Sequence, residues 1–223
     1  MRMHRKSHLD ERLQNCADIL TVADMSHKNM KEAAALPAYL DLEKIFGNGN
    51  PVHLEIGCGK GKFVAETALL HPEINFIAVE KISNVLIEAL ERVKADGIEN
   101  VYFINSAAEV LGRYIKDGAI SRIYLNFSNP LPKEGYKKQR LTHPKFLEIY
   151  SHLLTADGEI WQKTDDAAFF EFSLESYRQS GYKIREVCED LAAHPVEGDV
   201  ETEHEKLFKS RGKNIYRIVA VKA

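Results

Sequence analysis

The chain has 223 residues, of which 44% are hydrophobic and 28% charged, and its formal net charge is −3, values typical of a folded domain with short extensions rather than a disordered or fibrous chain. No apolar run reaches the ~20 residues of a membrane span and none follows the basic start, so we expect a cytoplasmic protein without a membrane-spanning segment. The three cysteines are widely spaced and form no CxxC pair, which predicts reduced thiols and no metal site.

The chain begins with a charged, weakly periodic stretch, residues 1–50, which we expect to form an arm or helical cover on a domain of residues 51–223. In that domain, runs rich in β-branched and aromatic residues alternate with amphipathic segments. In chain order the predicted strands are Val52–Ile56, Asn75–Glu80, Val101–Asn105, Arg122–Phe127, Glu159–Thr164, Lys183–Cys188 and Asn214–Val221. The predicted helices are Phe63–Leu70, Val85–Lys94, Glu109–Ile115, Lys145–Leu154 and Ala167–Arg178.

This alternation predicts an α/β fold with a doubly wound, Rossmann-like sheet of about seven strands. The segment before the last strand, Ala192–Lys213, is polar and has the pattern of a loop with one short helix. We therefore expect the sheet to be mostly parallel, with an antiparallel last strand.

A glycine-rich turn, Gly57-Cys58-Gly59-Lys60-Gly61, follows the first predicted strand. Glycines at such a turn let the backbone approach a ligand closely. The spacing GxGxG differs from the GxGxxG of dinucleotide sites, and the turn lacks the GK[ST] ending of a phosphate-binding loop. Glu80 closes the second strand, where a carboxylate can accept hydrogen bonds from ribose hydroxyls. Together, the glycine turn and Glu80 favour a site for a ribose-bearing ligand over the alternative that Glu80 is only a capping or surface residue.

A second polar loop follows the fourth strand and reads Asn126-Phe127-Ser128-Asn129-Pro130-Leu131-Pro132-Lys133. Its two prolines favour a rigid turn at the carboxyl end of the sheet, where ligands bind. Lys137, Lys138 and Arg140 could pair with phosphates, and Tyr136 offers a stacking surface, a combination that suits RNA. Further basic residues lie in the arm and in residues 206–213. A surface turn with solvated lysines is the alternative interpretation.

The pattern E-I-G-x-G-x-G with an acidic residue ending the second strand resembles the cofactor site of class I methyltransferases. The resemblance implies S-adenosyl-L-methionine as cofactor. It places the cofactor contacts at Glu55, Gly57, Gly59, Glu80, Ala107 and Asn129. A dehydrogenase is a more distant alternative, because NAD also accepts such a carboxylate.

The second loop narrows the resemblance to the bacterial tRNA (guanine-N7)-methyltransferase family, whose segment reads close to N-F-x-D-P-W-P-K, followed by a basic cluster and R-L-T. Lys163-Thr164-Asp165 and Thr202-Glu203-His204-Glu205 are further matches. The resemblance implies tRNA as partner and methylation of a guanine at N7, which we expect in the variable loop. It implies substrate contacts at Lys133, Asp165, Thr202, Glu203, His204 and Glu205. Separately, we expect a monomer or homodimer without metal.

The chain departs from this family at three positions. Asn129 stands where the family has aspartate, Leu131 where it has tryptophan, and Ala107 where an aspartate is expected near the adenine. Guanine N7 carries a lone pair at neutral pH, so no general base is needed and Asn129 remains the predicted catalytic residue as a positioning group. Two other interpretations stay open: methylation of another RNA base, and a diverged relative that binds RNA or cofactor without turnover.

Overall fold

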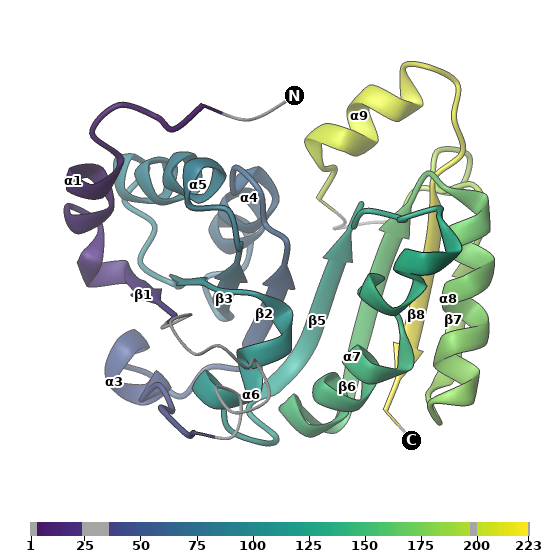
Figure 1. Cartoon of the computed structure of the whole chain (residues 1–223), viewed down its shortest axis with the longest axis horizontal. Helices are drawn as coiled ribbons and strands as arrows, with labels where there is room; N and C mark the ends of the chain where they lie inside the picture. The colour runs from purple at the N-terminus through teal and green to yellow at the C-terminus, as the bar shows by residue number, and fades with distance from the viewer. Residues whose placement is uncertain (1–3, 24–35, 197–199, 223) are drawn as a thin grey trace.

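The computed structural model describes residues 4–23, 36–196 and 200–222, and its centre is one eight-stranded sheet (Figure 1). The strands are β1 (Leu20–Val22), β2 (Val52–Ile56), β3 (Asn75–Val79), β4 (Val101–Asn105), β5 (Ile120–Asn126), β6 (Leu154–Thr164), β7 (Lys183–Cys188) and β8 (Tyr216–Val221). Their order is β1-β4-β3-β2-β5-β6-β8-β7. All pairings are parallel except those of β8, which runs antiparallel to both β6 and β7.

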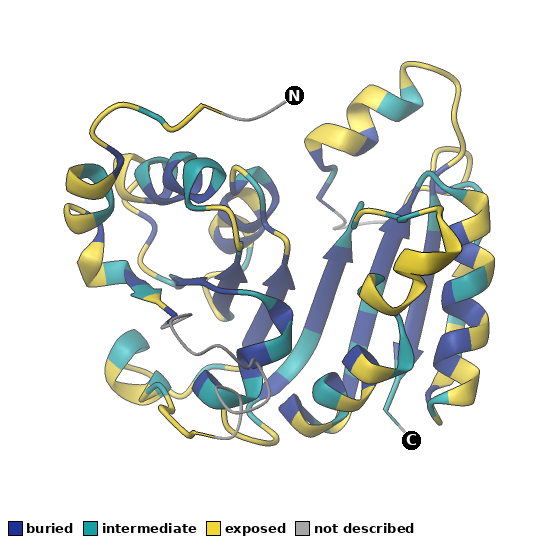
Figure 2. Ribbon diagram, in the orientation of Figure 1, coloured by how far each residue is buried: buried dark blue, intermediate teal, exposed yellow. Residues whose placement is uncertain are grey.

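Helices cover both faces of this sheet. The α-helices are α1 (Leu9–Gln14), α3 (Leu42–Phe46), α4 (Lys62–Leu70), α5 (Ser83–Ala95), α6 (Leu111–Tyr114), α7 (Pro144–Leu153), α8 (Ala167–Gln179) and α9 (Glu203–Lys209), and the 3-10 turns are η1 (Ala17–Ile19), η2 (Ala108–Val110) and η3 (Glu134–Gln139). Helices α1, α4 and α5 pack in one hydrophobic core, and α6, α7 and α8 pack in the other. Strands β2 and β3 are buried along their whole length, as expected for central parallel strands (Figure 2).

Helix starts follow familiar local signals. Asp166 and Thr202 cap α8 and α9 by accepting hydrogen bonds from backbone N–H groups of the first turn, and Pro144 occupies the first turn of α7. At the N-terminus, Arg12 binds both carboxylate oxygens of Glu91, at 2.7 and 2.6 Å, and so attaches α1 to α5. Local chemistry thus sets where several elements begin, and an ion pair ties the arm to the domain.

The predicted doubly wound fold and antiparallel last strand are confirmed, with two differences. β1 was not predicted; it is three residues long and its Val22 is exposed, so its sequence carries no clear alternation. The predicted helix over residues 109–115 is η2 followed by the short α6, because Val110 has non-helical backbone angles, φ −112° and ψ 11°. Within the described ranges, no helix has the length and apolar character needed to cross a membrane.

Candidate active site

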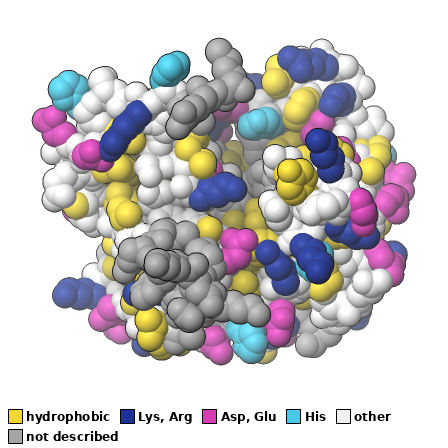
Figure 3. All heavy atoms as spheres, in the orientation of Figure 1, with side chains coloured by type: hydrophobic (Ala, Val, Ile, Leu, Met, Phe, Trp, Pro, Cys, Tyr) yellow, Lys and Arg dark blue, Asp and Glu magenta, His cyan; other side chains and the backbone are white. Residues whose placement is uncertain are grey.

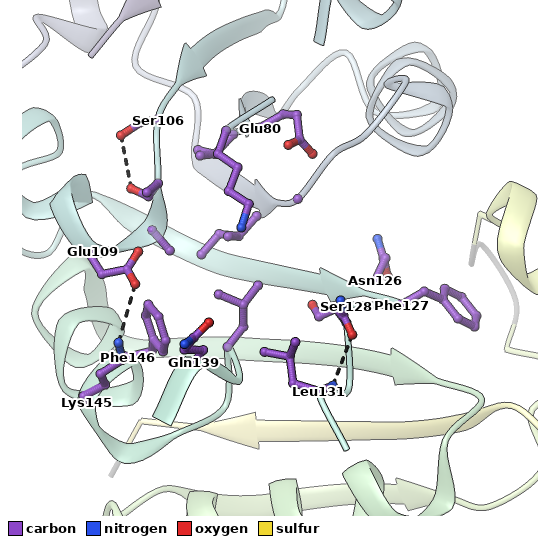
Figure 4. A pocket seen from close by; sticks show the side chains of 18 residues that line it. Glu80, Ser106, Glu109, Asn126, Phe127, Ser128, Leu131, Gln139, Lys145 and Phe146 are labelled. Carbon is purple, nitrogen blue, oxygen red and sulfur yellow. Dashed lines mark hydrogen bonds and ion pairs between the residues drawn. The ribbon is translucent and has the colours of Figure 1, made fainter. Parts of the chain in front are cut away.

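A cavity of about 730 Å³ lies at the carboxyl ends of β2, β3, β4 and β5, where the strand order reverses (Figure 4). The turns after these strands and the first turn of α7 line it. Figure 4 shows Glu109 and Lys145 at one end and Phe127 at the other, with Glu80 between them on the upper wall. This position and volume are those of a small-molecule site in an open α/β sheet.

The glycine turn forms the start of the cavity wall. The amides of Gly57 and Cys58 both donate to the carbonyl of Val79, at 2.8 and 3.0 Å, which holds the turn against β3. Gly57 and Gly59 have φ values of 85° and 58°, a region that favours glycine. At Gly61, a Cβ would lie 2.5 Å from that of Ala89 on α5, so a side chain is excluded there by packing. The turn therefore offers open backbone to a ligand on one side and close helix packing on the other.

Glu55 is a buried carboxylate beneath this turn. Its Oε1 accepts a hydrogen bond from Asn126 Nδ2 at 3.2 Å, while its buried Oε2 has no partner among the described residues. Burial raises the pKa of Glu55 to about 7, although the hydrogen bond from Asn126 opposes the shift. An unpartnered buried acceptor beside a ligand cavity is the kind of group that a cationic ligand satisfies. The ammonium group of S-adenosylmethionine fits this role.

Glu80 lies where the sequence placed it, at the end of β3 and on the cavity wall. Its Oε1 accepts the amide of Ile82 at 2.8 Å, which orients the carboxylate. The Asn105 side chain donates to the Glu80 carbonyl at 2.7 Å and fixes the backbone beneath it. Ala107 lines the same cavity after β4, so Gly57, Glu80 and Ala107, predicted from separate strands, come together.

The loop after β5 places Asn129 at the cavity edge under unusual backbone geometry. Phe127 and Leu131 have φ values of 51° and 46°, which residues other than glycine rarely adopt. Asn129 Oδ1 accepts the amide of Leu131 at 3.1 Å, and Arg140 donates to the Leu131 carbonyl at 3.3 Å. Two strained residues thus flank Asn129, and such strain concentrates at functional sites.

The predicted substrate residues on α9 divide into buried and exposed side chains. Thr202 is the N-cap, and its hydroxyl accepts the Glu205 amide at 3.0 Å. Glu205 is 1% exposed and binds Lys163 at 3.0 Å and Lys209 at 2.7 Å. Burial alone would raise the pKa of Glu205, but the two ammonium groups outweigh it and hold the pKa below its ordinary value. Both carboxylate oxygens are therefore occupied, and a substrate contact by Glu205 would have to displace a lysine.

The exposed residues of α9 face outward or toward the loop after β5. Glu203 is exposed, whereas the ring of His204 stacks on Phe127 with centroids 5.9 Å apart. Asp165, after β6, accepts from Lys213 at 2.6 Å, and the neighbouring Asp166 accepts from the Phe169 amide at the start of α8. None of the lining residues of the cavity comes from α9 or from the turn after β6, so these predicted substrate residues lie beside the cavity and not in it.

The basic residues near the site are dispersed. Lys133 and Lys138 are exposed, Lys137 pairs with Glu134, and Arg140 lies over the ring of Phe172. In the N-terminal arm, Lys6 binds Glu88 and Arg5 binds Asp10, while Arg2 lies outside the described residues. On the face shown in Figure 3, basic side chains are interspersed with acidic ones and do not form one patch.

Sequence reasoning missed several site features. It did not identify Phe127 as a wall of the cavity, Asn126 as the partner of Glu55, or Glu109 and Lys145 as a charged pair at the cavity end. The spacing Thr202-x-x-Glu205 is also the sequence pattern of a helix N-terminus, a signal that pointed to the capping role. Among the described residues, no group of three or more His, Cys, Asp or Glu side chains is arranged to hold a metal ion.

Comparison with known proteins gives consistent matches. A family model described as "Putative methyltransferase" matches residues 49–218. The tRNA (guanine-N(7)-)-methyltransferase of Geobacillus thermodenitrificans is 45% identical over 179 residues, covering 80% of this chain and 83% of that protein. The protein of the same name from Oceanobacillus iheyensis is 38% identical over 220 residues, covering 99% of this chain and 98% of that protein.

Two solved structures share the fold at low sequence identity. The 16S rRNA methyltransferase KamB has a TM-score of 0.65 and 14% identity, covering 83% of this chain and 94% of that chain. A SAM-dependent methyltransferase from Aquifex aeolicus has a TM-score of 0.55 and 13% identity, covering 98% of this chain and all of that chain, 100%. At these identities the likeness concerns the fold alone.

Proposed function

Because the chain belongs to the tRNA (guanine-N(7)-)-methyltransferase family, we propose that it is an enzyme that transfers a methyl group from S-adenosylmethionine to N7 of a guanine in tRNA. The observation that carries this proposal is the single cavity lined both by predicted cofactor residues, Gly57 and Glu80, and by Asn129 of the loop after β5. The target guanine is proposed to lie in the variable loop and the reaction to take place in the cytoplasm. Residues 51–223 are proposed to form the methyltransferase domain, to whose sheet the preceding part of the chain adds β1.

The cofactor supplies an electrophilic methyl group on a positively charged sulfur. Glu55 lies next to the lining residues Ile56 and Gly57 and would pair with its ammonium group, because the buried Oε2 atom has no partner in the described part of the chain. Glu80 would accept hydrogen bonds from the ribose hydroxyls, and the bare backbone of Gly57 and Gly59 leaves room for the amino-acid portion. These contacts would hold the cofactor in one orientation.

The nucleophile needs no proton removed, since N7 of guanine already carries a lone pair. Catalysis would then depend on holding N7 in line with the methyl group and on stabilising the cation that forms. Asn129 uses its Oδ1 for the Leu131 amide, so its NH₂ group is the end that would contact the base. O6 of guanine, next to N7, is an acceptor of the matching kind.

Negative charge near the reacting base is scarce. Asn129 carries none, Asp165 is paired with Lys213, and Asp166 caps α8. The developing cation on the base would therefore be stabilised less than beside an unpaired carboxylate, which should slow the chemical step.

Methyl transfer from labelled S-adenosylmethionine to bulk tRNA, followed by nucleoside analysis, tests the proposal. N7-methylguanosine supports it. A different methylated nucleoside would show that the enzyme methylates another base. Binding of the cofactor without any methylated product would show that the protein is a relative without turnover. The Asn129→Ala variant serves as control, because methylation that depends on this site should fall in it.

A further inference from the structure

Two charged side chains form a pair at the end of the cavity remote from Phe127 (Figure 4). Glu109 belongs to η2, after β4, and Lys145 to the first turn of α7. Lys145 Nζ lies 3.5 Å from Glu109 Oε1, and the side chains are 41% and 38% exposed. The Lys145 ammonium also lies 4.3 Å from the centre of the Phe146 ring, which keeps it against the cavity wall. The pair therefore presents one anion and one cation side by side to the cavity.

The walls around this pair are mostly apolar, and the polar side chain of Gln139 lies beside Phe146 (Figure 4). Ala107, Ala108, Leu141 and Phe146 line this end, and the side chain of Ala107 provides no polar atom. Ser106 Oγ donates to the Ala107 carbonyl at 3.1 Å, so its hydrogen is already used. A flat heteroaromatic ring would find apolar faces here, and Glu109 and Lys145 are the charged groups placed to meet its polar edge.

We propose that Glu109 and Lys145 recognise the adenine edge of the cofactor, Glu109 accepting a hydrogen bond from the 6-amino group and Lys145 donating one to N1. This inference rests on the proposed function, since it requires the cofactor in this cavity with its ribose at Glu80. Adenine carries a donor, the exocyclic 6-amino group on C6, next to an acceptor, the ring nitrogen N1 bonded to the same carbon. A carboxylate only accepts and an ammonium only donates, so the pair matches the donor and acceptor of that edge in kind.

This arrangement also accounts for Ala107. The chain lacks the carboxylate that its resemblance places at residue 107, and Glu109 supplies one two positions later, from the same turn after β4. The pair spans 36 residues of sequence, so it exists only because β4 and α7 meet at this cavity. A loose surface ion pair with no ligand is the competing explanation, and such pairs have little effect on either stability or binding.

Binding calorimetry with S-adenosylhomocysteine and two analogues tests the proposal atom by atom. One analogue carries purine in place of adenine and so lacks the 6-amino group; the other carries 1-deazaadenine and so lacks the N1 acceptor. Each is titrated into the wild type, Glu109→Ala and Lys145→Met. Glu148→Ala, an exposed acidic residue of α7 outside the cavity, is the matched control.

We expect Glu109→Ala to weaken S-adenosylhomocysteine binding about tenfold, the scale of one charge-assisted hydrogen bond, and to leave binding of the purine analogue unchanged. Lys145→Met should weaken S-adenosylhomocysteine binding similarly and leave binding of the 1-deaza analogue unchanged. Each residue would then be coupled to its own nitrogen of the base, as in a double-mutant cycle.

Equal losses for all three ligands, or no loss beyond that of Glu148→Ala, would overturn the assignment while leaving the proposed function intact. Failure of the wild type to bind S-adenosylhomocysteine would overturn the proposed function, and the role of the pair with it. Thermal unfolding of each variant verifies that a lost affinity does not reflect a lost fold.

Discussion

Replacing Glu55 with glutamine should have opposite effects on stability and on cofactor binding. Burial raises the pKa of Glu55 in the folded protein to about 7 from an ordinary 4.5. Between these two values the folded state holds a proton that the unfolded state has lost, so the free energy of unfolding falls as pH rises through this window. Above pH ~7 the carboxylate is charged in both states, and the folded protein bears the full cost of burying it.

The size of this cost follows from the shift. A difference of roughly 2.5 pKa units at 1.36 kcal/mol per unit corresponds to about 3 kcal/mol. Glutamine has the same shape, can accept the hydrogen bond from Asn126, and carries no charge. Glu55→Gln should therefore leave the stability of the ligand-free protein unchanged near pH 4 and raise it by up to about 3 kcal/mol near pH 8.5.

Cofactor affinity should change in the other direction. The wild-type carboxylate can pair with the cofactor's ammonium group above pH ~7, so the variant should bind S-adenosylhomocysteine more weakly at pH 8.5 and about equally at pH 6. Urea unfolding and calorimetry at these pH values measure both effects, with the exposed Glu99→Gln as control. A variant less stable than the wild type at pH 8.5, or a stability difference independent of pH, would refute the argument.

Four further predictions concern the rest of the site. Asn129→Asp should raise the single-turnover methylation rate about tenfold, because a full negative charge beside the cation that forms outweighs the one hydrogen bond to O6 that is lost with the NH₂ group. Equal rates for wild type, Asn129→Asp and Asn129→Ala would place this residue outside the reaction centre. Glu80→Ala should weaken S-adenosylhomocysteine binding by about 2 kcal/mol in calorimetry, and an unchanged affinity would remove Glu80 from the ribose site. Glu205→Gln should lower the free energy of unfolding by about 3 kcal/mol at pH 7, because it removes the charge that faces buried Lys163. This loss should become smaller as pH falls through the lowered pKa of Glu205. The control variant Glu203→Gln, at an exposed residue, should show neither effect. The affinity for tRNA should fall as salt rises, and it should fall less steeply in a variant with alanine at Lys133, Lys137 and Lys138. Arg140 is left intact because it donates to the Leu131 carbonyl and so holds the loop. Equal salt slopes for the wild type and this variant would count against phosphate contacts by the three lysines.

Local patterns in the sequence sufficed for the core of the fold. Strand β3 is a short, mostly apolar run because both faces of a central parallel strand are buried, and glycines mark the turn between β2 and α4. The order of strands and helices then restricts the fold to a doubly wound sheet, with its ligand site at the carboxyl ends. The positions of Glu80 and the glycine turn at the carboxyl ends of β3 and β2 could thus be predicted before any contact was known.

The substrate side of the site was less predictable. Sequence order groups residues 202–205 as one motif, yet the hydroxyl of Thr202 is used for capping α9 and the carboxylate of Glu205 for a buried ion pair. The partner of Glu205, Lys163, lies 42 residues away, and no local period reports such a contact. Whether a charged side chain faces a ligand or another side chain depends on which elements meet, which composition and spacing do not encode.

By itself, then, the sequence determined the sheet, the glycine turn and the carboxylate that ends β3, because each depends on backbone preferences and burial periods within a few residues. The tertiary structure alone decided that Glu55 is buried with one oxygen that no described residue partners, that Asp165 pairs with Lys213, and that Glu109 meets Lys145 at the end of the cavity. These features depend on the burial and neighbours of each charge, which are fixed only when distant strands and helices pack together.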